Sequence, residues 1–277
     1  MALKDILVHV DRTPHCEKRV KIALEIASRQ GNELTGIFAQ GNAYLEARTS
    51  GLDKRRKLHT DISEKLRMQF QPLADEAGVR LHWETAPFDR SEETIMDQMV
   101  FDSQHRDLII VGQHDEETYD GSIPADLAER LVLETGRPVL IIPYAGTFKT
   151  LGKRVVIAWN TARESVRALN DAIPLMQDAQ VVKVIAINPK EKNKRHGEVP
   201  SSDIVRHLKR HGIEAEADHF STEGVDEGNL LLNCVSDERS DLLVMGAYGH
   251  YRFRELILGG VTKEILEHMT TPVLMSH

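Results

Sequence analysis

The residues best suited to hold a ligand form a glycine-rich segment near the C-terminus. Two residues separate Gly246 from Gly249, and nine separate Gly249 from the pair Gly259 and Gly260. The segment follows an apolar run and precedes a helical pattern with Thr262 in its first turn. Glycines let a phosphate approach backbone N–H groups, and a helix N-terminus leaves such groups unpaired. The spacing therefore predicts an anion site, and the alternative is that these glycines only form turns.

The glycine-rich segment belongs to the second copy of an internal repeat. Asp107–His114 matches Asp241–Tyr248, and Arg137–Pro143 matches Thr271–His277, both at an offset of 134 residues. Separate matches at one offset indicate that a whole structural unit is duplicated. The chain is therefore expected to contain two similar domains.

The beginnings of the two copies show where their lengths differ. Lys4–Asp11 matches Lys153–Asn160 at an offset of 149 residues. The difference, 149 − 134 = 15 residues, indicates a deletion in the second copy between its second and third strands. A polar stretch with two glycines, Ala145–Gly152, separates the copies, so we expect domains at residues 1–148 and 149–277.

Each copy alternates short apolar runs, typical of buried parallel strands, with segments whose apolar residues recur at helical spacing. The predicted strands are Ile6–Val10, Leu34–Ala39, Val79–Glu84, Leu108–Val111 and Val139–Ile142, then Val155–Trp159, Val181–Ile187, Glu214–His219, Leu242–Met245 and Val273–Met275. This order predicts an α/β chain of two tandem five-stranded parallel doubly wound α/β sandwich domains. Ligands of such sheets bind beyond the carboxyl ends of the strands, where the strand order reverses.

The composition excludes several classes of protein. The net charge is −8, which argues against general affinity for nucleic acid or an anionic membrane surface. Two cysteines, Cys16 and Cys234, exclude a disulfide framework and favour a reducing compartment. No apolar run is long enough to span a bilayer, and the N-terminus enters the first strand without a leader pattern. We expect a soluble, cytoplasmic protein.

The glycine spacing and the repeat together resemble the universal stress protein family, with one family domain per half of the chain. The nucleotide motif of that family is Gly-x2-Gly-x9-Gly-(Ser/Thr), and the second copy matches it except that Gly260 replaces the Ser/Thr. The fold implied by the resemblance is that of the adenine-nucleotide α-hydrolase superfamily. In ATP-binding members the glycine segment holds the ribose and phosphates, and the ends of the first and second strands meet the adenosine.

Carried over to this sequence, the resemblance implies ATP, with or without Mg²⁺, in the C-terminal domain only. The implied binding residues are Asn160, Ala186, Ile187, Gly246, Gly249, Gly259, Gly260, Val261 and Thr262. Asn160 stands where the family has Asp, and its amide still offers an acceptor and adds donors. The missing hydroxyl at Gly260 removes one phosphate hydrogen bond, which lowers affinity about tenfold.

The first copy has lost most of this pattern. At the 134 offset, Asp115, Ala125, Asp126 and Ala128 replace Gly249, Gly259, Gly260 and Thr262. A carboxylate at Asp126 would repel a phosphate by about 4 kcal/mol at 4 Å. Asp11 keeps the family's first-strand Asp, but the other replacements indicate that this copy has lost triphosphate binding, so a structural role or an uncharged ligand is expected for it. We also predict a helix from Ile123 to Glu134, with Ser122 as its cap and Pro124 in its first turn.

These observations favour a non-enzymatic stress-response protein that binds an adenine nucleotide. One alternative is a nucleotide-independent scaffold, which the departures at Asp126 and Gly260 motivate. Another is a very slow ATPase, for which the sequence offers no identifiable base. Family resemblance also implies pairing through edge strands, which leaves open a homodimer of whole chains and an unidentified protein partner.

Overall fold

The protein divides into two compact units, Ala2–Tyr144 and Ala145–His277. The computed structural model describes residues 3–31, 33–41, 51–88, 92–188, 201–221, 226–249 and 260–277, with the backbone alone for residues 92–94. The division by contacts falls four residues before the boundary expected between residues 148 and 149. Each unit is described separately below.

The first unit contains one sheet of parallel strands. Its strands are β1 (Asp5–Val10), β2 (Glu33–Phe38), β3 (Arg80–Thr85), β4 (Leu108–Gly112) and β5 (Val139–Ile142). Their order is β3-β2-β1-β4-β5, and every neighbouring pair is parallel. The strand order reverses between β1 and β4, so the carboxyl ends of these two strands are where a ligand is expected.

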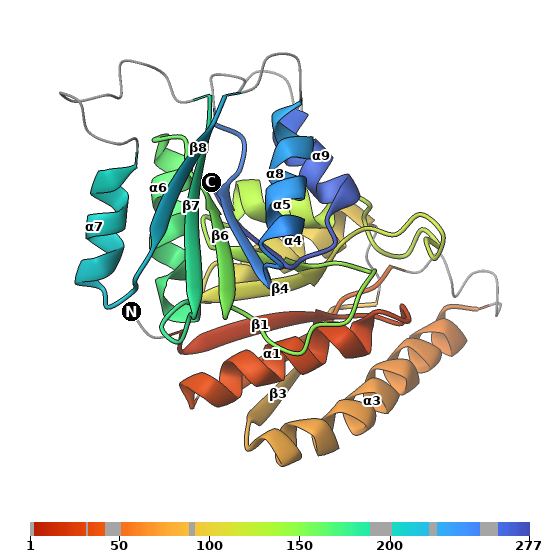
Figure 1. The fold of residues 1–277 in the computed structure, drawn as a ribbon. Coiled ribbons are helices and arrows are strands. Elements are labelled where there is room, and N and C mark those ends of the chain that lie inside the picture. The colour runs from red at the N-terminus through yellow and green to blue at the C-terminus, as the bar shows by residue number, and fades with distance from the viewer. Residues whose placement is uncertain are drawn as a thin grey trace. The chain divides into compact units, whose positions relative to one another are not determined.

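Helices cover both faces of this sheet. They are α1 (Cys16–Gln30), α3 (Leu52–Ala77), α4 (Glu92–Ser103) and α5 (Leu127–Glu134). Figure 1 shows α1 and α3 on one face, whereas α4 and α5 cover the other. The helical spacing in α1 places Val20, Ala23 and Ala27 in the core, as its apolar pattern predicts. Gly31 ends α1 in the left-handed conformation, with φ of 65°, which glycine adopts without steric cost.

The second unit repeats this arrangement. Its strands are β6 (Arg154–Ala158), β7 (Val181–Ile187), β8 (Glu216–Phe220), β9 (Leu242–Gly246) and β10 (Val273–Ser276). Their order is β8-β7-β6-β9-β10, and all neighbouring pairs are parallel. The reversal here lies between β6 and β9, which are the strands that precede Asn160 and the glycine segment.

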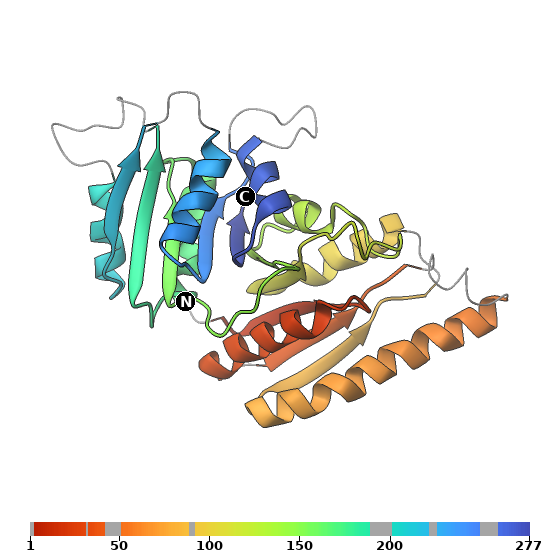
Figure 2. The same cartoon turned by 45° about the vertical axis from the view of Figure 1, so that its right-hand side comes forward.

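The helices of the second unit also lie on both faces of its sheet. They are α6 (Arg163–Ala172), followed by the 3-10 turn Ile173–Leu175, then α7 (Ser202–Arg210), α8 (Glu227–Asp237) and α9 (Gly260–His268). In Figure 2, α8 and α9 pack together on one face and α6 and α7 lie on the other. The deletion expected between the second and third strands is reflected in α7, which has 9 residues where α3 has 26.

One predicted helix boundary is wrong. Helix α5 begins at Leu127, with Asp126 at its N-cap position, so Ser122 and Pro124 precede the helix. The Asp120 carboxylate accepts a hydrogen bond from the Ser122 backbone N–H at 3.1 Å, and the Pro124 carbonyl accepts one from Leu127 N at 3.1 Å. These bonds hold residues 120–127 in consecutive turns, because an Asp side chain that binds the backbone two residues later competes with the helix.

The predicted fold class is confirmed, since each unit is a doubly wound five-stranded parallel sheet. None of the helices in the described part of the chain combines the length and apolar character needed to cross a membrane.

Candidate functional site

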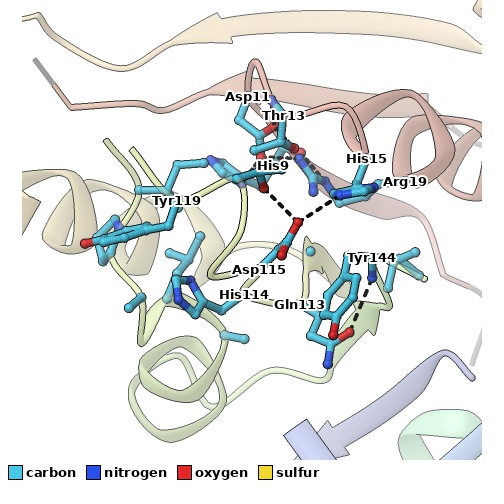
Figure 3. A pocket seen from close by; sticks show the side chains of 18 of the residues that line it. His9, Asp11, Thr13, His15, Arg19, Gln113, His114, Asp115, Tyr119 and Tyr144 are labelled. Atoms are coloured by element: carbon cyan, nitrogen blue, oxygen red, sulfur yellow. Dashed lines mark hydrogen bonds and ion pairs between the residues drawn. The ribbon is translucent and has the colours of Figure 1, made fainter. Parts of the chain in front are cut away.

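A small pocket opens at the carboxyl ends of β1, β4 and β5 in the first unit. It encloses about 60 Å³, which is room for a few water molecules. Figure 3 shows how its polar side chains gather from β1, α1 and the segment that follows β4. Its lining includes His9, Asp11, Thr13, His15, Arg19, Gly112, His114, Asp115 and Tyr119. The pocket therefore lies at the strand-order reversal, where the fold favours a ligand.

A buried ion pair closes the inner wall of this pocket. Arg19 Nη2 donates to Asp11 Oδ2 at 2.6 Å, and both side chains are 3 % exposed. Arg19 Nε donates to the His9 carbonyl at 2.7 Å. The other oxygen of Asp11 accepts from the backbone N–H and the hydroxyl of Thr13, at 2.8 and 2.5 Å. Both carboxylate oxygens of Asp11 thus have hydrogen-bond partners within the protein.

Burial and the ion pair shift the pKa values of Asp11 and His9. Burial raises the pKa of Asp11, but the Arg19 charge and the Thr13 hydrogen bonds outweigh burial and leave the pKa below its ordinary value. Burial lowers the pKa of His9 below 6.5, and the nearby Asp11 carboxylate opposes this shift only in part. His9 Nε2 lies 2.8 Å from the Ala39 carbonyl, which can only accept, so the neutral ring carries its proton on Nε2.

Asp115 also lines this pocket. Its Oδ2 lies 3.1 Å from His15 Nε2 and accepts from the Thr118 hydroxyl at 2.8 Å. Its Oδ1 accepts from the Glu117 backbone N–H at 3.1 Å. Burial raises the pKa of Asp115, yet the hydrogen bonds and His15 together hold that pKa below its ordinary value. Asp115 therefore adds a negative charge to the lining of the pocket, beside His15 (Figure 3).

The pocket gathers the positions that the repeat aligns with the predicted nucleotide site. Gly112, Asp115, Ala125 and Ala128 all line it, and at the 134 offset they correspond to Gly246, Gly249, Gly259 and Thr262. Asp11, which corresponds to Asn160 at the 149 offset, lines it as well. The fold thus brings the ends of β1 and β4 together with the start of α5.

The structure changes the role expected for Asp126. This residue is exposed at the N-cap position of α5, and it does not line the pocket. The later start of the helix moves its carboxylate away, and Asp115 supplies the pocket carboxylate instead. The negative charge expected in the first copy is present, but it comes from a different residue.

In the second unit, Asn160 and Gly249 lie next to each other beyond β6 and β9. Asn160 is exposed, and its Oδ1 accepts from the Ala162 backbone N–H at 3.0 Å. Its Nδ2 lies 3.9 Å from the position that a Cβ on Gly249 would take. These two members of the predicted site are therefore brought together by the fold.

The structure adds a residue that the sequence pattern did not reveal. Glu164, in the first turn of α6, places Oε2 at 3.4 Å from the same Cβ position on Gly249. Its side chain is 13 % exposed. A signal was present in the repeat, because Glu164 aligns at the 149 offset with His15, which lines the pocket of the first unit.

Close packing explains why residue 246 is a glycine, whereas the sequence pattern predicted that this glycine makes room for a ligand. A Cβ at this position would lie 2.4 Å from Ser165 N and 2.5 Å from the carbonyl carbon of Glu164. The end of β9 therefore packs directly against the backbone of α6, and this contact requires a glycine without any ligand.

The remaining predicted residues lie on β7 and α9. Ala186 is buried and Ile187 half-buried at the end of β7. Gly260 begins α9 and is exposed, and no atom of the residues that the structure describes lies within 4 Å of an added Cβ, whereas Val261 is half-buried. Thr262 is only 4 % exposed. Gly259 lies outside the described residues.

Comparisons with known proteins identify the second unit. Residues 153–277 match the sequence profile of the Universal stress protein family. A universal stress protein of Synechocystis sp. is 25% identical over 172 residues, which cover 61% of this chain and 57% of that relative. The chain thus spans a little over half the length of this curated relative.

Solved structures show the same fold over nearly the whole chain. A universal stress protein from Archaeoglobus fulgidus aligns with a TM-score of 0.73 at 16% identity, covering 98% of this chain and 97% of the other. A protein of unknown function from Pseudomonas aeruginosa PAO1 aligns with a TM-score of 0.64 at 16% identity, covering 99% and 92%. Residues 153–277 therefore match the universal stress protein family, and a solved universal stress protein shares the fold of nearly the whole chain.

Proposed function

We propose that the second unit binds an adenine nucleotide, ATP with or without Mg²⁺, and that the chain acts in a cytoplasmic stress response without catalysing a reaction. The observation that carries this proposal is the meeting of Asn160 and Gly249 at the carboxyl ends of β6 and β9. The order of the strands reverses there, which is where such sheets hold their ligands. In the family this is also the place where the first strand and the glycine segment face the adenosine.

The start of α9 supports a phosphate position. Gly260 is exposed in the first turn, and the helix N-terminus carries unpaired N–H groups and a partial positive charge. Among the described residues, nothing lies within 4 Å of a Cβ added at Gly260, so a phosphate can approach the backbone there. The missing hydroxyl at Gly260 makes this a weaker site than the family motif would provide.

The first unit is proposed to have a structural role. Its pocket already contains the Asp11–Arg19 ion pair, and Asp115 lines it as well. An adenosine would have to displace buried partners, and a phosphate would approach a negative charge. We therefore expect one nucleotide per chain.

Nucleotide content and titration test this proposal. The purified protein is denatured and its nucleotide measured by chromatography, and nucleotide-stripped protein is titrated with Mg-ATP by calorimetry. About one nucleotide per chain is expected. Two per chain would contradict the structural role of the first unit, and no heat up to millimolar ATP would favour the scaffold.

Substitutions at Gly260 supply matched variants, because a Cβ added there has no atom of the described residues within 4 Å. Gly260→Ser restores the hydroxyl of the family motif and should tighten ATP binding up to about tenfold. Gly260→Ala is the control for the helix start and should not tighten binding. Gly260→Glu places a carboxylate at the helix N-terminus, where it suits the helix but repels phosphate, and should abolish binding.

The nucleotide-independent scaffold stays the second candidate. The packing of Gly246 against α6 favours it, since that glycine is explained without a ligand. Either candidate function allows association with a second copy of the chain or with another protein. Light scattering of the purified chain measures whether two copies associate.

A further inference from the structure

A carboxylate lies inside the proposed nucleotide site, at the point where the strand end and the glycine segment meet. Glu164 Oε2 is 3.4 Å from the position of a Cβ on Gly249, and Asn160 Nδ2 is 3.9 Å from it. Glu164 extends from the first turn of α6, and its side chain is 13 % exposed. A ligand group resting on Gly249 therefore lies against these two side chains.

The two side chains offer complementary hydrogen bonds. Asn160 Oδ1 accepts from the Ala162 backbone N–H, so its Nδ2 amide is the donor beside Gly249. Glu164 Oε1 faces Arg163 Nη2 at 3.4 Å, which leaves Oε2 on the Gly249 side as an acceptor. The negative charge that Asn160 lacks is thus supplied by a residue four positions later.

A carboxylate at this place selects the chemistry of the group that rests on Gly249. A phosphate oxygen would meet a like charge at short range, which is unfavourable without a bridging cation. A hydroxyl would donate to the carboxylate, and a charge-assisted hydrogen bond of this kind is stronger than one between neutral groups. The adjacent pair of hydroxyls on a ribose presents such donors, and an acidic side chain recognises ribose hydroxyls in dinucleotide-binding folds.

We propose that Glu164 binds the ribose hydroxyls of the nucleotide and makes the second unit selective for ribonucleotides over deoxyribonucleotides. This inference rests on the proposed function, since it assigns the ribose of the same ligand to the pair formed by Glu164 and Asn160. The phosphates then extend away from Gly249 toward Gly260 at the start of α9.

The test compares ATP with 2′-deoxy-ATP and 3′-deoxy-ATP by calorimetry on the nucleotide-stripped full chain. At least one deoxy analogue should bind at least ten times more weakly than ATP. An analogue that lacks the hydroxyl facing Glu164 leaves the shielded carboxylate without a hydrogen-bond partner. Glu164→Gln should weaken ATP binding and leave binding of that analogue nearly unchanged, so that the selectivity falls to about twofold or less. Glu214→Gln is the control, because it removes the same charge from a residue whose side chain is 81% exposed.

The outcomes separate this inference from the proposed function. Equal affinity of the unsubstituted protein for all three nucleotides overturns the role of Glu164 and leaves ATP binding intact, and this comparison needs no variant. Absence of binding by any of them overturns the proposed function itself. A Glu164→Gln variant that binds all three nucleotides more tightly would show that the carboxylate repels phosphate. A variant that loses only the dependence on Mg²⁺ would show that the carboxylate holds the cation, and both results overturn the ribose assignment.

Discussion

Arg19 lies directly over Gly112, since a Cβ on this glycine would be 2.4 Å from Arg19 Nη1. In the second unit the corresponding glycine, Gly246, meets the backbone N of Ser165 at the same distance. The position of Arg19 is taken there by Ala168, 149 residues later. A glycine thus stands at this position in both halves, but a charged side chain fills the space beside it in one half and a helix backbone fills it in the other.

Removing the arginine should destabilise the first unit strongly. Arg19→Met leaves the Asp11 carboxylate buried without its charged partner, and breaking such a pair costs about 3–5 kcal/mol. Urea unfolding measured by circular dichroism checks this loss. Adding Asp11→Asn to Arg19→Met removes the unpaired charge and should recover part of it. A loss below about 1 kcal/mol in the single variant would mean that the ion pair is not essential to the fold.

Alanine substitutions at two glycines of the second unit should change the free energy of unfolding differently. Gly246→Ala forces a methyl group into the α6 backbone and should lower the free energy of unfolding by about 1–3 kcal/mol. Gly260→Ala adds the same methyl where no atom in the described part of the chain lies within 4 Å, and it should be neutral or stabilise by up to about 1 kcal/mol. Thermal unfolding of the two variants measures the difference. Equal melting temperatures would refute the close packing of β9 on α6.

The stability of the protein should fall below about pH 6.5 because of His9. The pKa of His9 is lowered in the folded state, so the unfolded chain takes up a proton that the native chain does not. This contribution is fully present above the unfolded pKa of 6.5 and is lost as the pH falls through the folded value. A slope of up to about 1.4 kcal/mol per pH unit is expected from this side chain.

Urea unfolding at several pH values between 8 and 5 measures that slope. The pKa of His59 is also lowered by burial, so the His9→Gln variant should retain a smaller slope. An unchanged slope in this variant would contradict the assignment. The pKa of Asp11 is lowered as well, so its contribution is present above about pH 4 and is lost only as the pH falls below that.

Both cysteines should be unreactive in the folded protein. Burial raises the pKa of the Cys16 thiol to about 12 and also raises the pKa of Cys234. Thiolate is the reactive form, so at pH 8 a chromogenic thiol reagent should label neither residue until urea is added. Rapid labelling of the native protein would show that one of the units opens readily.

The sequence by itself determined the fold and indicated the strand ends at which a site is expected. The repeat and the alternation of apolar strands with helices are local patterns, and they predicted the ten strands within two residues at each end. The glycine spacing indicated which strand end a ligand would approach. The start of α5 was misplaced, because side-chain hydrogen bonds in the preceding turns compete with the helix there.

The tertiary structure alone decided which side chains meet at that place. Asp11 and Arg19 are eight residues apart, and their pairing depends on how α1 packs against β1 and β4. The contact of Glu164 with Gly249, and that of Gly246 with Ser165, likewise join α6 to residues more than 80 positions away. Such contacts depend on the angle and distance at which a helix packs on a sheet, and these are set by the packing of the whole unit rather than by local sequence.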